Sequence, residues 1–178
     1  MKLLQHTIPF ILTGLLCCLQ PEAQPMSRSF KQLDSLRQIH PKPIIIFVYT
    51  DWCRYCRAME AVTFRNKKVA TCLDRHFYFA MLNAEERRSI RFLDSSFRYR
   101  PTGIQSGEHE LAAWLRNGQP AAYPALFILS SRGEPLLRTN SYLIPEDLIR
   151  LLEAVPKNDP TIHKAAAETN RAVPYGNH

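Results

Sequence analysis

The sequence is poor in glycine and lacks the motifs that glycine usually serves. Six of its 178 residues are glycine, and none of them belongs to a Gly-rich loop that could cradle a phosphate. The chain also lacks internal repeats and the aromatic segments with which RNA-binding modules stack bases. Lys and Arg outnumber Asp and Glu by 23 to 16, an excess that a solvated basic face explains. We therefore expect a globular protein with no nucleic-acid partner.

No apolar run is long enough to cross a bilayer. The run at residues 10–19 has ten residues, whereas a spanning helix needs about 20. Its length and position are typical of a secretory signal. We predict a signal peptide over residues 1–23, cleaved after Ala23, and an extracytoplasmic, periplasmic location. Lipid attachment at Cys17 or Cys18 is the second alternative and an uncleaved anchor the third, and all three place the folded domain outside the cytoplasm.

Cysteine is too scarce for a disulfide-stapled scaffold. Removal of the signal leaves Cys53, Cys56 and Cys72, and an odd number cannot all pair within the chain. Cys53 and Cys56 form a Cys-x-x-Cys pair, which zinc sites, structural disulfides and redox centres all use. A zinc site needs four ligands, and the scattered histidines lack paired spacing. A disulfide across so small a loop adds little stability, so we interpret the pair as redox-active, with no metal and no other cofactor.

Hydrophobic spacing predicts alternating strands and helices. The unbroken run at 44–49 predicts a strand buried on both faces. Tyr55, Met59 and Val62 have helical spacing, which predicts a helix from Cys53 to Phe64 with these side chains along one face. The other expected elements are a helix at 29–39 within a lead-in segment 24–42, a helix capped by Asn66 that carries Val69, Cys72 and Leu73, a strand at 77–82, a β-hairpin at 90–100 that turns at 94–96, a helix at 108–116 with Leu111, Trp114 and Leu115 on one face, strands at 125–129 and 136–138, and a helix opened by Pro145. The polar residues 157–178 are predicted to be a disordered tail.

The position of the cysteine pair suggests its chemistry. Cys53 is expected at a helix N-terminus, where unsatisfied backbone N–H groups and the helix dipole stabilise a thiolate, the reactive form. Cys56, one turn later, lies on the same face and can attack a mixed disulfide formed by Cys53. We assign Cys53 as the nucleophile and Cys56 as the resolving thiol, with Arg54 and Arg57 lowering the pKa of Cys53.

These residues carry a family resemblance. The stretch Trp52-Cys53-Arg54-Tyr55-Cys56 resembles the thioredoxin active site, and its continuation through Met59-Glu60 is similar to the exported thioredoxin-like branch with a C-x-x-C-x-x-M-E signature. Further matches are Phe64, Asn66, Val69-Ala70 and Asn83-Ala84-Glu85-Glu86. The resemblance covers about residues 40–155. It implies an α/β thioredoxin fold over residues 43–156, a central mixed sheet flanked by helices, here with an inserted β-hairpin, and it implies thiol–disulfide oxidoreductase activity.

The resemblance also implies roles near the pair. Tyr123-Pro124 stands where the family has a cis-proline, which would expose the Tyr123 backbone to a substrate peptide and deter metal binding at the thiols. Trp52 is expected to shield the thiols and pack under the loop. The dipeptide Arg54-Tyr55 replaces the Gly-Pro of common thioredoxins, and redox poise depends on this dipeptide.

One departure concerns proton transfer. Phe47 occupies the position at which many thioredoxins carry a buried carboxylate. Glu60, one helical turn after Cys56, is the candidate substitute. The alternative is that Glu60 pairs with Arg57 or a lysine at the surface.

The functional interpretations follow from these residues. The first is an extracytoplasmic thiol–disulfide oxidoreductase that acts on protein thiols and disulfides and depends on a membrane electron-transfer or reoxidising partner. The alternative is a binding module that docks a partner beside Pro124 and uses its disulfide as a switch without turnover, and a metal or haem chaperone is the third. The arginine-rich segment around 90–100 is expected to be a solvated basic flap, with a role in partner choice as its alternative.

Overall fold

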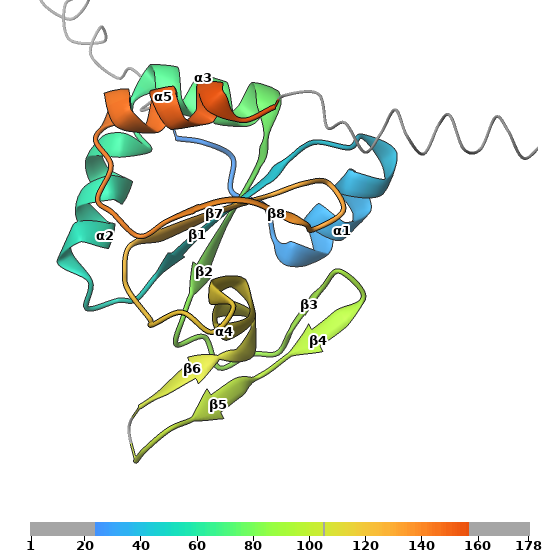
Figure 1. Cartoon of the computed structure of the whole chain (residues 1–178), viewed down its shortest axis with the longest axis vertical. Coiled ribbons are helices and arrows are strands. Elements are labelled where there is room, and N and C mark those ends of the chain that lie inside the picture. Colours follow the sequence, from blue (N-terminus) through green and yellow to red (C-terminus); the bar gives the residue numbers. More distant parts are fainter. Residues whose placement is uncertain (1–23, 105, 157–178) are drawn as a thin grey trace, which may run out of the picture.

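A four-stranded mixed sheet lies at the centre of the computed structural model, which describes residues 24–104 and 106–156 (Figure 1). β1 (Ile44–Tyr49) pairs in parallel with β2 (Tyr78–Asn83) and antiparallel with β7 (Ala125–Leu129), and β8 (Pro135–Thr139) completes the order β2-β1-β7-β8. The predicted thioredoxin-like mixed sheet is confirmed. The predicted signal peptide and tail lie outside the described residues.

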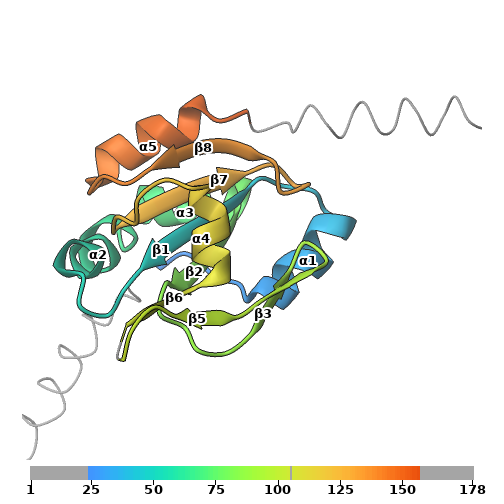
Figure 2. The same cartoon turned by 60° about the horizontal axis from the view of Figure 1, so that its bottom comes forward.

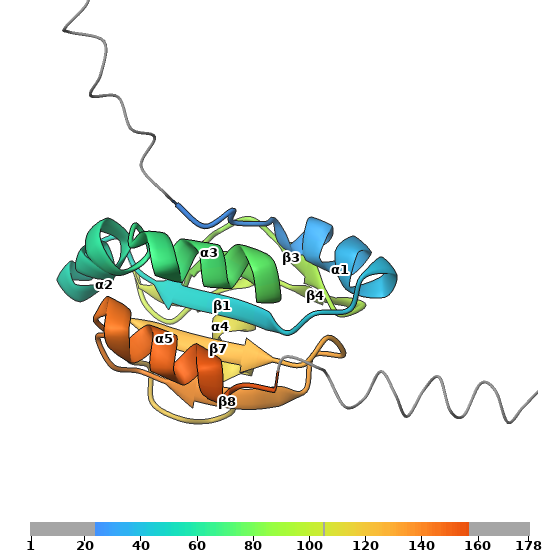
Figure 3. The same ribbon diagram turned by 90° about the horizontal axis from the view of Figure 1, so that it is seen from above.

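Helices cover both faces of this sheet (Figures 1 and 3). α2 (Arg54–Ala58), its continuation η1 (Met59–Thr63), α3 (Lys67–His76) and α5 (Pro145–Ala154) pack on one face. α1 (Phe30–Ile39) and α4 (Glu110–Arg116) pack on the other. β1 is therefore buried on both sides, as its unbroken apolar run predicts. Within the described residues, no helix combines the length and apolar character needed to span a membrane.

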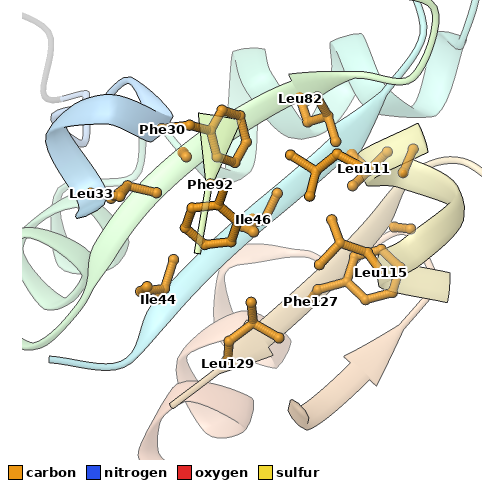
Figure 4. Packing of buried hydrophobic residues seen from close by; sticks show 14 of the residues in the cluster. Phe30, Leu33, Ile44, Ile46, Leu82, Phe92, Leu111, Leu115, Phe127 and Leu129 are labelled. Carbon is orange, nitrogen blue, oxygen red and sulfur yellow. The ribbon is translucent and has the colours of Figure 1, made fainter. Parts of the chain in front are cut away.

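Alternation along β1 divides the core into two layers. Ile44 and Ile46 face α1 and α4, where they meet Phe30, Leu111 and Phe127 (Figure 4). Ile45 and Phe47 face the other layer, which also holds both sulfurs of the cysteine pair. The lead-in helix α1 shares the first layer with the rest of the fold, and the boundary set at residue 42 stays a prediction.

The ends of the helices follow local chemistry. The side chain of Asn66 accepts hydrogen bonds from Lys68 N and Val69 N at the start of α3, as predicted. Pro145 is the first residue of α5, where its missing N–H costs no helical hydrogen bond. Gly133 has φ +90°, which suits glycine, in the turn between β7 and β8.

The inserted segment differs in detail from the single hairpin predicted at 90–100. β3 (Ile90–Phe92) and β4 (Ser95–Phe97) do form a hairpin, but its turn is Leu93-Asp94, where both residues have positive φ as in a type I′ turn. A second ribbon of β5 (Tyr99–Pro101) and β6 (Gly107–His109) follows, so residue 108 lies in a strand and not in the predicted helix. The predicted turn at 94–96 was wrong because three-residue strands carry too few apolar positions to mark their ends.

Two predicted helix faces were wrong in part, because Met59, Leu111 and Leu115 are buried as expected but the other members are not. Tyr55 and Val62 are 66% and 53% exposed, whereas the buried positions are Cys56, Met59 and Thr63. The backbone winds as a π-helix from Met59 to Thr63, and this wider turn changes which side chains face the sheet. Trp114 is 44% exposed and contacts the ring of Phe97 in the inserted hairpin.

His109 joins the insertion to the core. Its side chain is fully buried, and its Nδ1 accepts a hydrogen bond from Leu111 N (3.2 Å) at the start of α4. The other ring nitrogen, Nε2, therefore carries the proton and donates to Arg88 O (3.2 Å). The bond from Leu111 N needs a neutral ring, because a protonated Nδ1 cannot accept it. Burial lowers the pKa of His109, although Arg88 O and the nearby charges of Glu86 and Glu110 oppose the shift.

We expect the free energy of unfolding to fall as the pH drops below 6.5, the ordinary pKa of histidine. A lowered pKa in the folded state means that the unfolded chain binds the proton more readily, so stability is lost as the pH falls through this range. Urea unfolding between about pH 7.5 and pH 5.5 tests this, because most carboxylates stay ionised there. The variant His109→Asn should lose the dependence, whereas the exposed control His40→Asn should keep it. An unchanged slope in His109→Asn would contradict the assignment.

Candidate active site

The cysteine pair lies where β1 leads into α2. Cys53 caps α2, and its Sγ accepts a hydrogen bond from Cys56 N at 3.1 Å. The two cysteines form a disulfide. Cys53 is 5% exposed and Cys56 is fully buried. Cys53 is thus the more accessible of the two sulfurs, and the assignment of Cys53 as the attacking sulfur and Cys56 as the resolving one stays a prediction.

Trp52 comes directly before the pair, and its role in shielding the thiols stays a prediction. It is 64% exposed, so the expected packing under the loop is wrong. Its Nε1 donates a hydrogen bond to Glu85 Oε1 (3.0 Å), and its ring meets the ring of Tyr123 edge-on at 5.9 Å. These two contacts hold the indole at the rim of the site, where its face is open to solvent.

Tyr55 gives the site a second aromatic rim. It is exposed and contacts Tyr142, whose ring centroid lies 6.0 Å away in the loop between β8 and α5. Arg54 is also exposed. The side chain of Arg57 turns back to donate a hydrogen bond to Asp51 O. The pair is therefore framed by aromatic side chains, with Arg57 tied to the preceding loop.

Glu60 lies among acidic and phenolic groups near the base of this loop. Burial raises the pKa of Glu60, the charge of Asp51 raises it further, and Arg57 lowers it. Glu60 and Asp51 in turn add to the burial that raises the pKa of Tyr49. Phe47, at the position of the missing carboxylate, is fully buried and packs edge-on against Phe64 at 4.9 Å. Glu60 is thus a carboxyl group held close to the redox loop.

The Tyr123–Pro124 peptide bond is cis, and Pro124 is buried. Ala125 pairs with Val48, which places Pro124 beside the end of β1 from which the cysteine loop departs. The structure thus brings Tyr123 and Pro124 to the same end of the sheet as the cysteine pair. Their roles in binding substrate stay predictions.

Two residues behind Tyr123 were missed by sequence reasoning. Glu108 accepts hydrogen bonds from Nε and Nη2 of Arg116 (3.1 and 2.7 Å) and one from the hydroxyl of Tyr123 (3.4 Å). Burial and the neighbouring Glu108 raise the pKa of Tyr123 to about 12, so the phenol stays protonated as the donor. Glu108 belongs to β6 and Arg116 to α4, and only the fold brings them to Tyr123.

The donor set around the cysteines offers no metal site. Among residues 24–104 and 106–156, no group of three or more His, Cys, Asp or Glu side chains is close enough to hold a metal ion.

The profile of the thioredoxin-like domain family matches residues 30–156. Among solved structures, an oxidoreductase named DsbH is 16% identical, with a TM-score of 0.53 over 78% of this chain and 90% of its own. A putative disulphide-isomerase from Bacteroides thetaiotaomicron is 22% identical (TM-score 0.52, 77% and 99% covered), and a thioredoxin from Thermus thermophilus is 13% identical (TM-score 0.53, 86% and 99% covered). These identities are low, so the likenesses establish the fold alone. No curated protein matches the sequence.

We expect Glu108→Gln to lower the free energy of unfolding by about 1–3 kcal/mol, because Arg116 then keeps its charge in a half-buried place without its counter-ion. Tyr123→Phe should cost less, about 1 kcal/mol, because it removes one hydrogen bond and leaves the ring against Trp52. Urea denaturation measures both, and Glu134→Gln, an exposed site, is the control. Equal free energies of unfolding for Glu108→Gln and the control would show that the Glu108–Arg116 ion pair does not stabilise the fold.

Proposed function

The chain belongs to the thioredoxin-like domain family, and from that premise we propose that its cysteine pair exchanges disulfides with protein substrates outside the cytoplasm. Family and cysteine pair together make the chain a thiol–disulfide oxidoreductase. The observation that carries the proposal is the hydrogen bond from Cys56 N to Cys53 Sγ at 3.1 Å. The same N–H stabilises the thiolate when the disulfide opens.

The exchange has two steps. A substrate thiolate attacks Sγ of Cys53, the Cys53–Cys56 bond breaks, and Cys56 leaves as a thiolate that takes up a proton. A second thiolate of the substrate then attacks the substrate sulfur that is bonded to Cys53, and Cys53 leaves as a thiolate. The substrate loses two electrons and the protons of its two thiols, and the cysteine pair gains the electrons. Run backward, the same steps reduce a substrate disulfide.

Burial determines which sulfur reacts with the substrate. Cys56, within α2, is fully buried, whereas Cys53 retains 5% exposure. A substrate segment that lies along the backbone at Tyr123, next to the cis peptide bond, would reach Cys53 first. The resolving attack by Cys56 then stays within the protein, shielded from competing thiols.

The location and redox partner are part of the proposal. Residues 10–19 support export, because a ten-residue apolar run is typical of a signal. Outside the cytoplasm, a reducing protein needs electrons delivered across the membrane and an oxidising one needs reoxidation. We therefore propose a membrane electron-transfer or reoxidising partner.

We expect Cys53→Ser to reduce turnover of a protein disulfide to the background rate, because no other sulfur can begin the exchange. Cys56→Ser should instead accumulate mixed disulfides, since the resolving thiol is lost. Insulin reduction with dithiothreitol measures turnover, and non-reducing electrophoresis detects the trapped species. Cys72→Ser is the matched control and should keep its activity. A single stoichiometric exchange by the wild type, without turnover, would favour the binding-module alternative.

Glu60 is proposed to accept the proton of the Cys56 thiol during the resolving attack. We expect Glu60→Gln to slow release of the mixed disulfide by about 10²-fold, the scale of a general base, without slowing the first attack. In the wild type, release should slow as the pH falls through the pKa of Glu60, which is raised above 4.5. Rapid-quench measurements separate the two steps, with the exposed Glu153→Gln as control. An identical pH profile in Glu60→Gln would exclude this role.

A further inference from the structure

A groove of about 770 Å³ lies along the side of the sheet that β2 borders. Its walls come from α1, from the end of β2, and from the segment that leads into β3. Figure 2 shows α1 and β3 side by side there, and residues of the two elements are in contact. Apolar side chains form part of the lining, among them Phe30, Met81, Leu82 and Ile90.

The groove exposes the edge of a strand. β2 is the outermost strand of the sheet, and among the described residues only Ser27 pairs with it from outside, opposite Phe79. In this bridge, Arg28 N donates to Phe79 O at 2.7 Å. Alternation along a strand turns the N–H and C=O of Met81 toward the same outer edge. The chain itself thus shows that this edge accepts an extended segment, and the pairing stops where the groove begins.

The charges along the groove are unbalanced. Its three carboxylates share two arginine partners: Glu86 pairs with Arg88, and Asp34 and Asp94 both pair with Arg37.

Three further cations line the same groove, namely Arg28, Lys31 and Arg91. Lys31 and Arg91 are exposed, and none of the three forms an ion pair within residues 24–104 and 106–156. The lining therefore combines apolar side chains with an excess of positive charge.

The groove reaches the redox loop. Tyr49 and Asn83 line it at the ends of β1 and β2. The side-chain Nδ2 of Asn83 donates to Asp51 Oδ1 (3.1 Å), two residues before Cys53. A segment lying in the groove would therefore end close to the cysteine pair.

We propose that this groove binds an extended acidic segment of the protein substrate, which adds as a strand to the free edge of β2. Backbone hydrogen bonds to the edge supply affinity, as in β-strand addition generally, and the three cations select carboxylates. The inference rests on the proposed function for its biological meaning, but binding at the groove needs neither cysteine. Arg91 of the inserted hairpin then takes part in partner choice.

The test is binding of a short, fluorescent, cysteine-free peptide of alternating Glu and Val, measured by anisotropy. We expect the variant Lys31→Glu/Arg91→Glu to raise the dissociation constant by about tenfold or more, because two attractions to the peptide carboxylates become repulsions. The control Lys67→Glu/Lys68→Glu, on α3 at the opposite face, should bind as the wild type does. Reduction of oxidised glutathione should be unchanged in both variants.

Two further measurements separate the outcomes. Cys53→Ser should bind the peptide normally, so that loss of redox activity and loss of docking are distinguished. Amide hydrogen exchange on the wild type should show peptide-induced protection at Met81–Asn83 and Ser89–Arg91. Unchanged affinity in the double variant, protection elsewhere, or equally tight binding of a Lys-Val peptide or of a single-stranded oligonucleotide would overturn the proposal.

Discussion

The hydrogen bond from Cys56 N to Cys53 Sγ links the redox-active sulfur to the buried core of the protein. Both sulfurs belong to the same buried layer as Phe47, Met59 and Leu126. The two cysteines are therefore part of the hydrophobic core and lie at its edge. Opening the disulfide places a new charge at the edge of this layer, and the N–H of Cys56 is already directed at the sulfur that carries it. This arrangement requires β1 to end at Tyr49 and α2 to begin directly after Cys53.

The inserted ribbons support the part of the site around the Tyr123–Pro124 peptide bond. Glu108 reaches Tyr123 from β6, and Arg116 fixes Glu108 from α4. Tyr123 then contacts Trp52, which donates a hydrogen bond to Glu85, two residues after the end of β2. Each contact in this series is individually modest, but together they join three separate parts of the chain. The loop that carries the cis peptide bond is thus supported from behind by residues of the insertion.

Local chemistry made part of this structure predictable. The run at 44–49, the cap at Asn66 and the opening proline of α5 each specify an element through neighbouring residues alone, and each is found as predicted. The cysteine pair was predictable for the same reason, because its spacing and its strand-to-helix context are local.

Long-range geometry made the rest unpredictable. Glu108 pairs with Arg116 because β6 turns into α4, and a sequence read as one helix over 108–116 cannot show this. Tyr55 and Val62 have the spacing of a buried helix face, yet the π-turn at 59–63 directs the helix toward the sheet through other side chains. The groove beside β2 needs α1, β2 and β3 together, so none of its three segments indicates it alone.

The two edges of the sheet differ in a way that bears on where a partner strand can add. β8 begins with Pro135, which has no N–H to donate, and its pairing with β7 shifts register at Ile128/Leu129. Prolines and bulges are devices that protect an edge from further pairing. β2 contains neither, and its own chain already pairs with it at Ser27 before turning into α1. The edge left open is therefore the one with unmatched cations beside it, and it leads to the loop that carries Cys53.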